Sequence, residues 1–423
     1  MLNASPLLKN TTSSTSHNSL IRCGARRARA CRRACSSSRS HRHSQARSAS
    51  SASFSALSAS SASSASSSND SYAKTLSIWL LENERDDVID TDLAILLSSI
   101  ASACKQISSL VKLAPLQGNT GAAGTENASG DEVKKLDVLA NEVFVNTLRS
   151  TGRTGIIVTE EEEQPVAIDV VSGGDYIATF DPIDGSSNLD AAVTSGAIFG
   201  VYHPNEQCKV DASMDDVLEQ CLTAVQQSGE ALAASGYCMF SASAVFMITV
   251  GNGVYGFTLD ETCGEFILTH EKLKIPEMGQ GGQAIVSCNL GNTPLWDPKL
   301  AKYVDTLYSA EGAAAAGLDL KHNKDKPYSY RYIGALVGDF HRTLLYGGIW
   351  LYPPDSKAPE GKARLLYEVA PIGMIAEQAG GMATFGDKAE KRVLDVVPKK
   401  VHQKHPMFVG SKGEVERLQK FLA

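Results

Sequence analysis

Acidic residues are nearly absent from the first 72 residues, and large apolar side chains are scarce there. The segment holds nine arginines, one lysine, a single acid (Asp70) and no glutamate, so its formal charge is +9. Residues 36–68 contain only Phe54 and Leu57 as large apolar residues, too few to bury a core, and the leader has no apolar run of roughly 7–15 residues such as a secretory signal needs. An arginine-rich, serine-rich and acid-poor leader is typical of organelle transit peptides, and the long serine tract favours a plastid. We therefore expect residues 1–72 to be a disordered plastid transit peptide, with a retained disordered tail as the alternative.

Positive charge is deficient in the rest of the chain. The formal charge of the 423 residues is −7, which leaves −16 for residues 73–423. An acidic body argues against nucleic acid as its main partner, and it leaves room for a positively charged partner such as a divalent metal. With 43% hydrophobic residues, the chain has the composition of a globular protein and the length for about two domains of roughly 100–200 residues each.

The body also lacks a disulfide framework and a membrane span. Its six cysteines stand apart from one another in the sequence, whereas small secreted proteins space theirs as bridges; they are Cys104, Cys208, Cys221, Cys238, Cys263 and Cys288. Residues 231–259 carry no formal charge, but the Gly251–Gly253 break and several serines in this stretch indicate two strands of a hairpin. We expect no membrane association.

Helical and strand patterns alternate along the body without an internal repeat. Apolar residues recur at helical spacing over residues 93–111 and 133–144, and short β-rich runs follow at 155–158 and 176–180. This mixture predicts an α/β or layered α+β fold. We place the domain boundary near residues 263–269, which gives an N-terminal domain over residues 73–265 and a C-terminal domain over residues 266–423.

Carboxylates gather where these predicted elements begin or end. They are Asp131 and Asp137 at the start of a helix, Glu160–Glu163 after one β-rich run, and Asp181 and Asp184 after the next. Two acid clusters at the carboxyl ends of strands meet where α/β sheets usually bind ligands. Taken alone, Glu160–Glu163 also fits a solvated acidic loop. Oxygen ligands without histidine or cysteine favour Mg²⁺ or Mn²⁺ over zinc.

Residues 181–188, with the sequence DPIDGSSN, combine a metal motif with a phosphate motif. Asp181 and Asp184 are close enough to share a metal, and the carbonyl of Ile183 offers another hard oxygen ligand. The small residues Gly185–Ser187 expose backbone N–H groups that can hold a phosphate. Metal beside phosphate predicts hydrolysis by a metal-activated water.

These motifs resemble the metal-dependent, lithium-sensitive sugar and inositol phosphatases. The segments that narrow the resemblance to fructose-1,6-bisphosphatase are Tyr330–Gly334, Gly338–Ile349, Leu365–Glu368 and Glu377–Gly381, and the match runs from about Thr75 to the C-terminus. The resemblance implies a five-layered αβαβα fold, a homotetramer, and hydrolysis of fructose 1,6-bisphosphate to fructose 6-phosphate and phosphate in the chloroplast, as part of the Calvin cycle and sugar synthesis.

The resemblance also implies roles for individual residues. Metal is expected at Glu160, Glu161, Asp181, Asp184, Glu368 and the carbonyl of Ile183; Glu161 with Asp137 is expected to activate the water, and Asp131 to orient it. The 1-phosphate is expected at Gly185, Ser186 and Ser187. The distal phosphate and sugar are expected at Asn289, Tyr332, Tyr352, Lys362 and Arg331, the last from a neighbouring subunit. One position departs from the family pattern, because Asn292 stands where a second tyrosine is usual.

Residues 204–230 resemble the thioredoxin-regulated insert of chloroplast fructose bisphosphatases. Several acids make the segment an exposed loop in this interpretation, and two exposed thiols, Cys208 and Cys221, are expected to close a regulatory disulfide. The third cysteine usual in that insert is absent, since Gln226 occupies its position. Two unrelated thiols are the alternative.

Two other functions remain open at this point. Sedoheptulose-1,7-bisphosphatase shares metal, mechanism and compartment, although its own redox pair is not seen near Cys104. A non-catalytic sugar-phosphate-binding scaffold would have lost a metal ligand, and every expected carboxylate is present.

Overall fold

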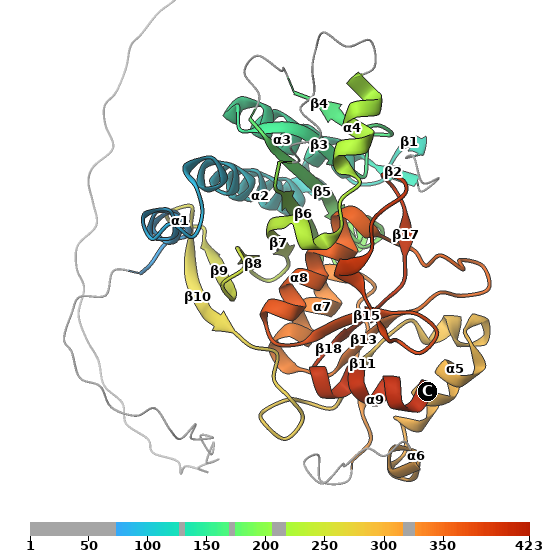
Figure 1. Ribbon diagram of the computed structural model, residues 1–423. Coiled ribbons are helices and arrows are strands. Elements are labelled where there is room, and N and C mark those ends of the chain that lie inside the picture. The colour runs from blue at the N-terminus through green and yellow to red at the C-terminus, as the bar shows by residue number, and fades with distance from the viewer. Residues whose placement is uncertain (1–72, 127–131, 169–173, 205–216, 316–325) are drawn as a thin grey trace, which may run out of the picture. The chain divides into compact units, whose positions relative to one another are not determined.

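The computed structural model describes residues 73–126, 132–168, 174–204, 217–315 and 326–423 (Figure 1). The leader expected at residues 1–72 therefore lies outside the described residues. The described residues belong to one compact unit that spans Asp70–Ala423.

The first sheet has eight strands, and the three N-terminal helices cover its outer face. Its order is β10 (Glu265–Leu273), β9 (Val254–Asp260), β8 (Ala244–Thr249), β7 (Leu232–Phe240), β6 (Ser195–Tyr202), β5 (Tyr176–Asp184), β3 (Thr154–Thr159) and β4 (Val166–Ala167). The covering helices are α1 (Leu76–Arg85), α2 (Thr91–Gln117) and α3 (Lys135–Thr151), which share one apolar core with this sheet. Strands β3 and β5 are parallel neighbours, so their carboxyl ends lie at the same edge.

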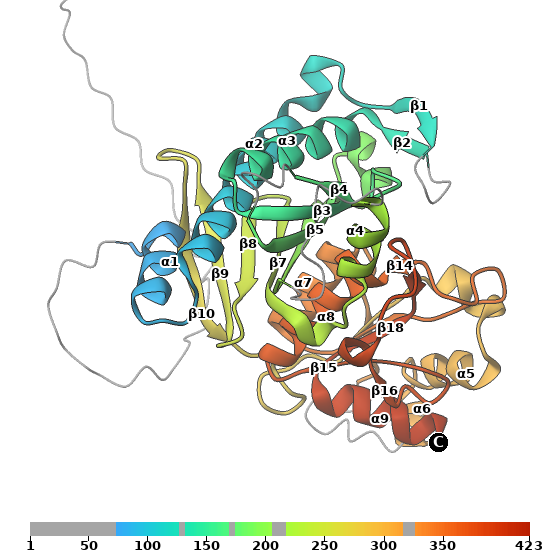
Figure 2. The ribbon, with the colours of Figure 1, turned by 45° about the horizontal axis from the view of Figure 1, so that its top comes forward.

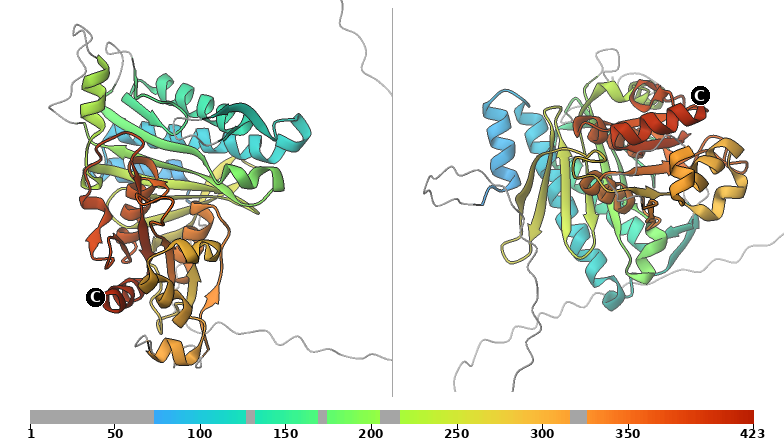
Figure 3. Two further views of the ribbon diagram at one scale, coloured as in Figure 1. Left: turned by 90° about the vertical axis from the view of Figure 1, so that its right-hand side faces the viewer. Right: turned by 90° about the horizontal axis from the view of Figure 1, so that it is seen from below.

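The second sheet has six strands and lies on the other side of two central helices. Its order is β12 (Ser329–Tyr330), β11 (Ile285–Ser287), β13 (Ile349–Tyr352), β18 (Met407–Gly410), β15 (Met382–Phe385) and β16 (Lys391–Arg392). The central helices are α7 (Leu336–Tyr346) and α8 (Ala370–Gln378), and the outer helices are α5 (Pro298–Thr306) and α9 (Lys412–Leu422). Figures 2 and 3 show the resulting order of helices, sheet, helices, sheet and helices. The expected αβαβα architecture is confirmed.

Short elements complete the chain around these layers. They are the β1 (Ala122–Glu126) and β2 (Glu132–Lys134) pair, α4 (Val217–Val225), α6 (Ala310–Ala315), the β14 (Ala363–Arg364) and β17 (Lys404–His405) pair, 3₁₀ turns at Ser186–Ala191, Gly229–Ala231, Leu290–Leu295 and Val393–Asp395, and a π-helical turn at Leu365–Val369. The β14–β17 pair is important for the site, because it leads directly into the turn that carries Glu368.

The uncharged stretch 231–259 forms three strands rather than the expected two. The Gly251–Gly253 break does separate β8 from β9, but the chain also turns at Ser241–Ser243, between β7 and β8. Two serines around one alanine are enough to end a strand when both flanking segments are buried in a sheet. By length and apolarity alone α2 could cross a membrane, but half of its most apolar window is buried within the fold, as in the core helix of a soluble protein.

The division at residues 265 and 266 stays a prediction. Strand β10 pairs with β9 and extends the first sheet as far as Leu273, and the second sheet begins with β11 at Ile285.

Candidate active site

A cleft of about 870 Å³ opens at the carboxyl ends of β3 and β5, beside the first turn of α7 and the 357–364 segment. Its lining contains most of the residues that the sequence singled out: Asp137, Glu160, Glu161, Asp181, Ile183, Asp184, Gly185, Ser186, Ser187, Tyr332, Tyr352, Lys362 and Glu368. Parallel pairing explains the meeting of the acids. The amide of Glu160 donates to the carbonyl of Phe180 (3.3 Å), and this contact sets Glu160 beside Asp181.

Three carboxylates form the centre of the cleft. One oxygen each of Glu160, Asp181 and Glu368 lie within 4.8 Å of one another, and Asp181 and Glu368 are buried. Asp181 is held by the amide of Ile183 (2.9 Å), and Asp184 by the amide of Val337 (2.8 Å). Such a buried set of hard oxygens fits a divalent cation.

The electrostatics of the cluster support the same conclusion. Burial, followed by repulsion from Glu160, raises the pKa of Glu368 to about 8 and holds that of Asp181 well above its usual range. Burial also raises the pKa of Asp184 to about 7, although amides of α7 oppose the shift. Buried carboxylates that repel one another are compatible with ionisation only when cations compensate them.

Asp137 lies at the edge of this cluster on the first turn of α3. Its Oδ2 accepts from the amide of Lys134 (2.8 Å), whereas its buried Oδ1 has no hydrogen-bond partner among the described residues. Burial, with repulsion from Glu160 as a smaller cause, raises its pKa to about 7. A carboxylate with this pKa and a vacant acceptor is suited to take a proton from water near neutral pH. Asp131, expected to act with it, lies outside the described residues.

The Gly185–Ser187 turn starts a 3₁₀ helix with Gly185 at its N-cap, in the left-handed region (φ +75°). A Cβ at this position would come within 2.6 Å of the Cβ of Ala335, on the segment that enters α7. The turn therefore packs against α7 so closely that only glycine fits.

Gly185→Ala is expected to lower both stability and phosphate release, and Gly118→Ala provides its control. Gly118 has nearly the same φ (+72°), but a Cβ there meets nothing within 4 Å. The control should cost only the backbone strain of about 1 kcal/mol. Gly185→Ala should cost about 1–3 kcal/mol more from overpacking and should lower kcat/KM at least tenfold. Chemical unfolding and steady-state kinetics measure the two effects; equal losses in both variants would contradict the packing argument.

A smaller pocket adjoins the cleft and holds the residues expected at the distal phosphate. It is lined by Asn289, Asn292, Tyr332, Tyr352 and Lys362, among others, and the last three also line the cleft. The ammonium of Lys362 lies 3.4 Å from the buried carboxylate of Asp355. The two pockets share a wall, as a substrate with two separated phosphates requires.

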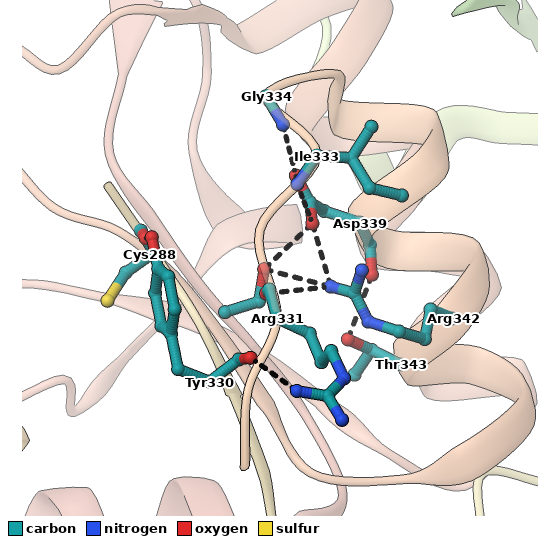
Figure 4. Close-up of polar contacts among 9 residues, drawn as sticks. Cys288, Tyr330, Arg331, Ile333, Gly334, Asp339, Arg342 and Thr343 are labelled. Carbon is teal, nitrogen blue, oxygen red and sulfur yellow. Dashed lines mark hydrogen bonds and ion pairs between the residues drawn. The ribbon is translucent and has the colours of Figure 1, made fainter. Parts of the chain in front are cut away.

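Arg331 lies away from both pockets. It is exposed, and its Nη1 donates to the carbonyl of Tyr330 (2.9 Å), as Figure 4 shows. The structure therefore does not bring it to the site of its own chain, and its entry into a neighbouring subunit's site stays a prediction.

The sequence interpretation missed Arg364, which lies among the carboxylates. Its guanidinium is 3.2 Å from Glu160 with 6% of the side chain exposed, and its backbone amide donates to Glu368. A charged residue immediately before the otherwise apolar run Leu365–Tyr367 was the available clue, because an arginine in such a run is buried only with a partner.

The expected exposure of Cys221 is wrong. Cys221 is 1% exposed and packs on the side of α4 that carries Ala224 and Val225, within the core between the two sheets. The polar residues Glu219 and Thr223 of α4 are exposed, because α4 is an amphipathic helix. Burial raises the pKa of the thiol. Cys208 lies outside the described residues.

The metal-free protein is expected to become less stable as the pH rises from about 5.5 to 8. In the folded state Asp137 and Asp184 have a pKa of about 7 and Glu368 of about 8, above the values near 4 in the unfolded chain. The folded state therefore holds more protons across this window, and the free energy of unfolding falls with pH, by about 3 kcal/mol or more. Thermal melts at both pH values check this. Saturating Mg²⁺ should flatten the dependence, and a stability that rises with pH without metal would contradict it.

A five-layered αβαβα fold with a carboxylate cleft beside a Gly-Ser-Ser turn defines the class of metal-dependent sugar phosphatases. Two family models match the chain: the fructose-1-6-bisphosphatase N-terminal domain over residues 74–271 and its C-terminal domain over residues 279–423. The chain belongs to the fructose-1,6-bisphosphatase family, and this family requires a divalent metal.

Relatives and solved structures agree with this assignment. The chain is 53% identical over 351 residues to the chloroplastic fructose-1,6-bisphosphatase of Triticum aestivum, covering 82% of this chain and 81% of the relative. It is 52% identical over 358 residues to that of Spinacia oleracea, covering 83% and 81%. The crystal structure of Leishmania major fructose-1,6-bisphosphatase in holo form superposes with a TM-score of 0.73 at 37% identity, covering 83% of this chain and 99% of that one. The chloroplast location expected from the leader is confirmed.

Proposed function

We propose that this fructose-1,6-bisphosphatase uses Mg²⁺, or Mn²⁺ in its place, held by the acids of the cleft. The ligands would be Glu160, Glu161, Asp181, Asp184, Glu368 and the carbonyl of Ile183. The observation that carries the proposal is the meeting of Glu160, Asp181 and Glu368 within 4.8 Å, beside a turn suited to phosphate. When bound, the metal would polarise the phosphate and the attacking water and stabilise the leaving oxygen.

The chain's own residues would then handle the proton and orient the substrate. Asp137 and Glu161 accept a proton as the oxygen of water attacks phosphorus, with Asp131 orienting that water. The bond between phosphorus and the sugar C1 oxygen breaks, and this oxygen takes up a proton as the product forms. Backbone N–H groups of Gly185–Ser187 hold the departing phosphate. Water supplies an OH group to the phosphate, and its other proton passes from the carboxylates to the sugar C1 oxygen, so the reaction balances.

The neighbouring pocket would hold the phosphate that is not cleaved. Asn289, Tyr332 and Tyr352 supply neutral donors, and Lys362 supplies a charge. Arg331 would come from another subunit of a homotetramer, because its exposed guanidinium lies away from this chain's cleft.

Phosphate release from fructose 1,6-bisphosphate, with and without Mg²⁺, tests the proposal. We expect activity with Mg²⁺, loss after chelation, and recovery on adding Mg²⁺ back. Sedoheptulose 1,7-bisphosphate assayed side by side should give the lower kcat/KM. Metal-independent activity would overturn the assignment of the carboxylates.

We further propose that a Cys208–Cys221 disulfide switches the enzyme off and that thioredoxin reduces it. Because Cys221 is 1% exposed, its oxidation requires α4 to leave the core. The bridge constrains the chain by about 3 kcal/mol, and in the oxidised protein it would hold α4 away from its position in the core. Displacement of α4 would disturb β4 and, through it, β3, which ends immediately before Glu160, because α4 packs on β4 and β4 pairs with β3.

Dithiol activation is expected to depend on both cysteines of this pair. Oxidised wild type should gain activity about tenfold or more on reduction, as a shift of a few kcal/mol in a two-state site permits. Cys208→Ser and Cys221→Ser should be active without reductant, and Cys263→Ser, at an exposed thiol, should behave as wild type. A Cys208→Ser protein that still needs reductant would contradict the proposal.

A further inference from the structure

The first turn of α7 contacts both halves of the site. At its N-terminus the amide of Val337 donates to Asp184 of the metal cluster (2.8 Å). Two residues later, in the same turn, Asp339 holds the 331–334 segment through the amides of Ile333 and Gly334, and this segment carries Tyr332 into the distal pocket. A single rigid element thus connects the carboxylates to the residues that face the uncleaved phosphate.

Asp339 accepts hydrogen bonds from three directions, although only 1% of it is exposed (Figure 4). The amide of Ile333 donates to both carboxylate oxygens (2.9 and 3.1 Å), and the amide of Gly334 donates to Oδ2 (2.9 Å). Ser287 Oγ donates from β11 (2.9 Å), and Arg342 Nη2 donates at 2.7 Å. A buried carboxylate with this many donors is fixed in place.

Arg342 holds the other end of the same segment. Its Nη2 lies 3.1 Å from the carbonyl of Arg331, so the pair Asp339–Arg342 contacts the segment on both sides of Tyr332. Residues 331–334 belong to none of the described strands and helices, and Gly334 has φ +87°. An irregular segment of this kind keeps one conformation only when its surroundings impose it.

We propose that Asp339 and Arg342 are positioning residues that fix Tyr332 for the uncleaved phosphate. The inference rests on the proposed function, in which Tyr332 donates to that phosphate. Asp339 lies at the wall of the cleft with 1% exposed, but its oxygens accept from protein donors, so neither residue touches substrate in this scheme. Their action is to set the spacing between the metal cluster and the distal pocket through α7, and so to select sugars that carry a second phosphate at the right distance.

The test compares a substrate that carries the distal phosphate with one that lacks it. Asp339→Asn and Arg342→Lys are assayed on fructose 1,6-bisphosphate and on fructose 1-phosphate, with sedimentation to confirm an unchanged assembly. The KM for the bisphosphate should rise about 10–100-fold, as expected for one lost hydrogen bond to a charged group, with kcat changed less than about threefold. The kcat/KM for fructose 1-phosphate should stay within about twofold. Product inhibition by fructose 6-phosphate should weaken in parallel, and inhibition by inorganic phosphate should not.

Ser287→Ala is the matched control, because it removes one hydrogen bond to Asp339 and one from Arg342 but none to residues 331–334. Its KM should remain within about twofold of wild type. Equal losses on both substrates, or an unchanged KM in Asp339→Asn and Arg342→Lys, would overturn the inference. If Asp339→Asn does not fold, Arg342→Lys, which keeps the charge, decides it alone. Wild type that fails to hydrolyse the bisphosphate would instead overturn the proposed function.

Discussion

Asp181→Asn is expected to lower the activity with Mg²⁺ about 10³-fold, while making the metal-free protein more stable. Asp181 lies with Glu160 and Glu368 at the centre of the carboxylate cluster, so its replacement weakens the binding of the metal. The charge stabilisation that a catalytic metal supplies is worth several kcal/mol. Phosphate release at saturating Mg²⁺ measures the loss. Part of the loss should persist at any Mg²⁺ concentration, because the geometry of the remaining ligands changes as well.

The gain in stability follows from the same burial. Only 2% of Asp181 is exposed, and burial followed by repulsion from Glu160 and Glu368 holds its pKa well above the usual range. Asparagine removes that repulsion, and its carbonyl oxygen can still accept from the amide of Ile183. The melting temperature without metal should rise by about 1–2 °C, as a gain of about 1 kcal/mol gives in a folded body of about 350 residues. With saturating Mg²⁺ the order should reverse, because wild type binds the cation more tightly.

Glu163→Gln provides the control for this prediction. Glu163 belongs to the same run of four glutamates, but it lines a separate groove beside residues 399–406 and not the cleft. Its replacement should leave both activity and the Mg²⁺ effect on stability unchanged. If Glu163→Gln lost as much activity as Asp181→Asn, the loss would come from general negative charge and not from the geometry of the cluster.

Local motifs allowed the sequence to predict the metal cluster and the phosphate turn. Asp181, Asp184 and Gly185 lie within five residues of one another, so their chemistry is visible in one short segment. Their meeting with Glu160 followed from strands that end at one edge of a sheet. Arg364 and the Asp339–Arg342 pair were not predicted, because the first acts through a partner distant in sequence and the second is buried against an irregular segment whose path the sequence pattern does not specify. Arg364 pairs with Glu160, 204 positions away, and Asp339 with Ser287, 52 positions away.

The wrong expectations have a common physical cause. The Cys221 segment was interpreted from its acids as an exposed loop, although Cys221, Ala224 and Val225 are spaced three and four residues apart and form one buried face of α4. The stretch 231–259 was given one turn too few, because Ser241–Ser243 is a weaker signal than Gly251–Gly253. In both cases the residue composition outweighed a weaker signal beside it: the helical spacing of Cys221, Ala224 and Val225 in the first, and the turn at Ser241–Ser243 in the second.

Arg364→Gln is expected to have the opposite effect on stability from Asp181→Asn. The guanidinium of Arg364 lies against Glu160 within the carboxylate cluster, 6% exposed. Its removal leaves buried acids without a fixed counter-charge, which typically costs about 3–5 kcal/mol. Activity should fall about 100-fold, the upper end of what a residue that orients metal ligands contributes. Added Mg²⁺ should recover most of the stability but little of the activity, because Arg364 also donates to the carbonyl of Lys362, which lines both pockets.

Arg417→Gln separates the two effects. Arg417 pairs with Glu414, whose side chain is 1% exposed, in α9 on the outer layer. This variant should lose stability by a similar amount, keep its kcat/KM, and show no recovery with Mg²⁺. Equal responses of the two arginine variants to Mg²⁺ would show that Arg364 acts only as a structural ion-pair partner.

The double variant Asp181→Asn, Arg364→Gln tests whether both residues act on one electrostatic cluster. If repulsion among the acids is what Arg364 relieves, removing one acid should lower the cost of removing the guanidinium. The double variant should then be more stable without metal than the sum of the single effects predicts, by about 1–2 kcal/mol, within the range for residues in one network. Additive effects would mean that Arg364 stabilises the fold through its contacts with Lys362 and Glu160 alone. A positive coupling that disappears in saturating Mg²⁺ would show that the arginine and the cation offset the same charge.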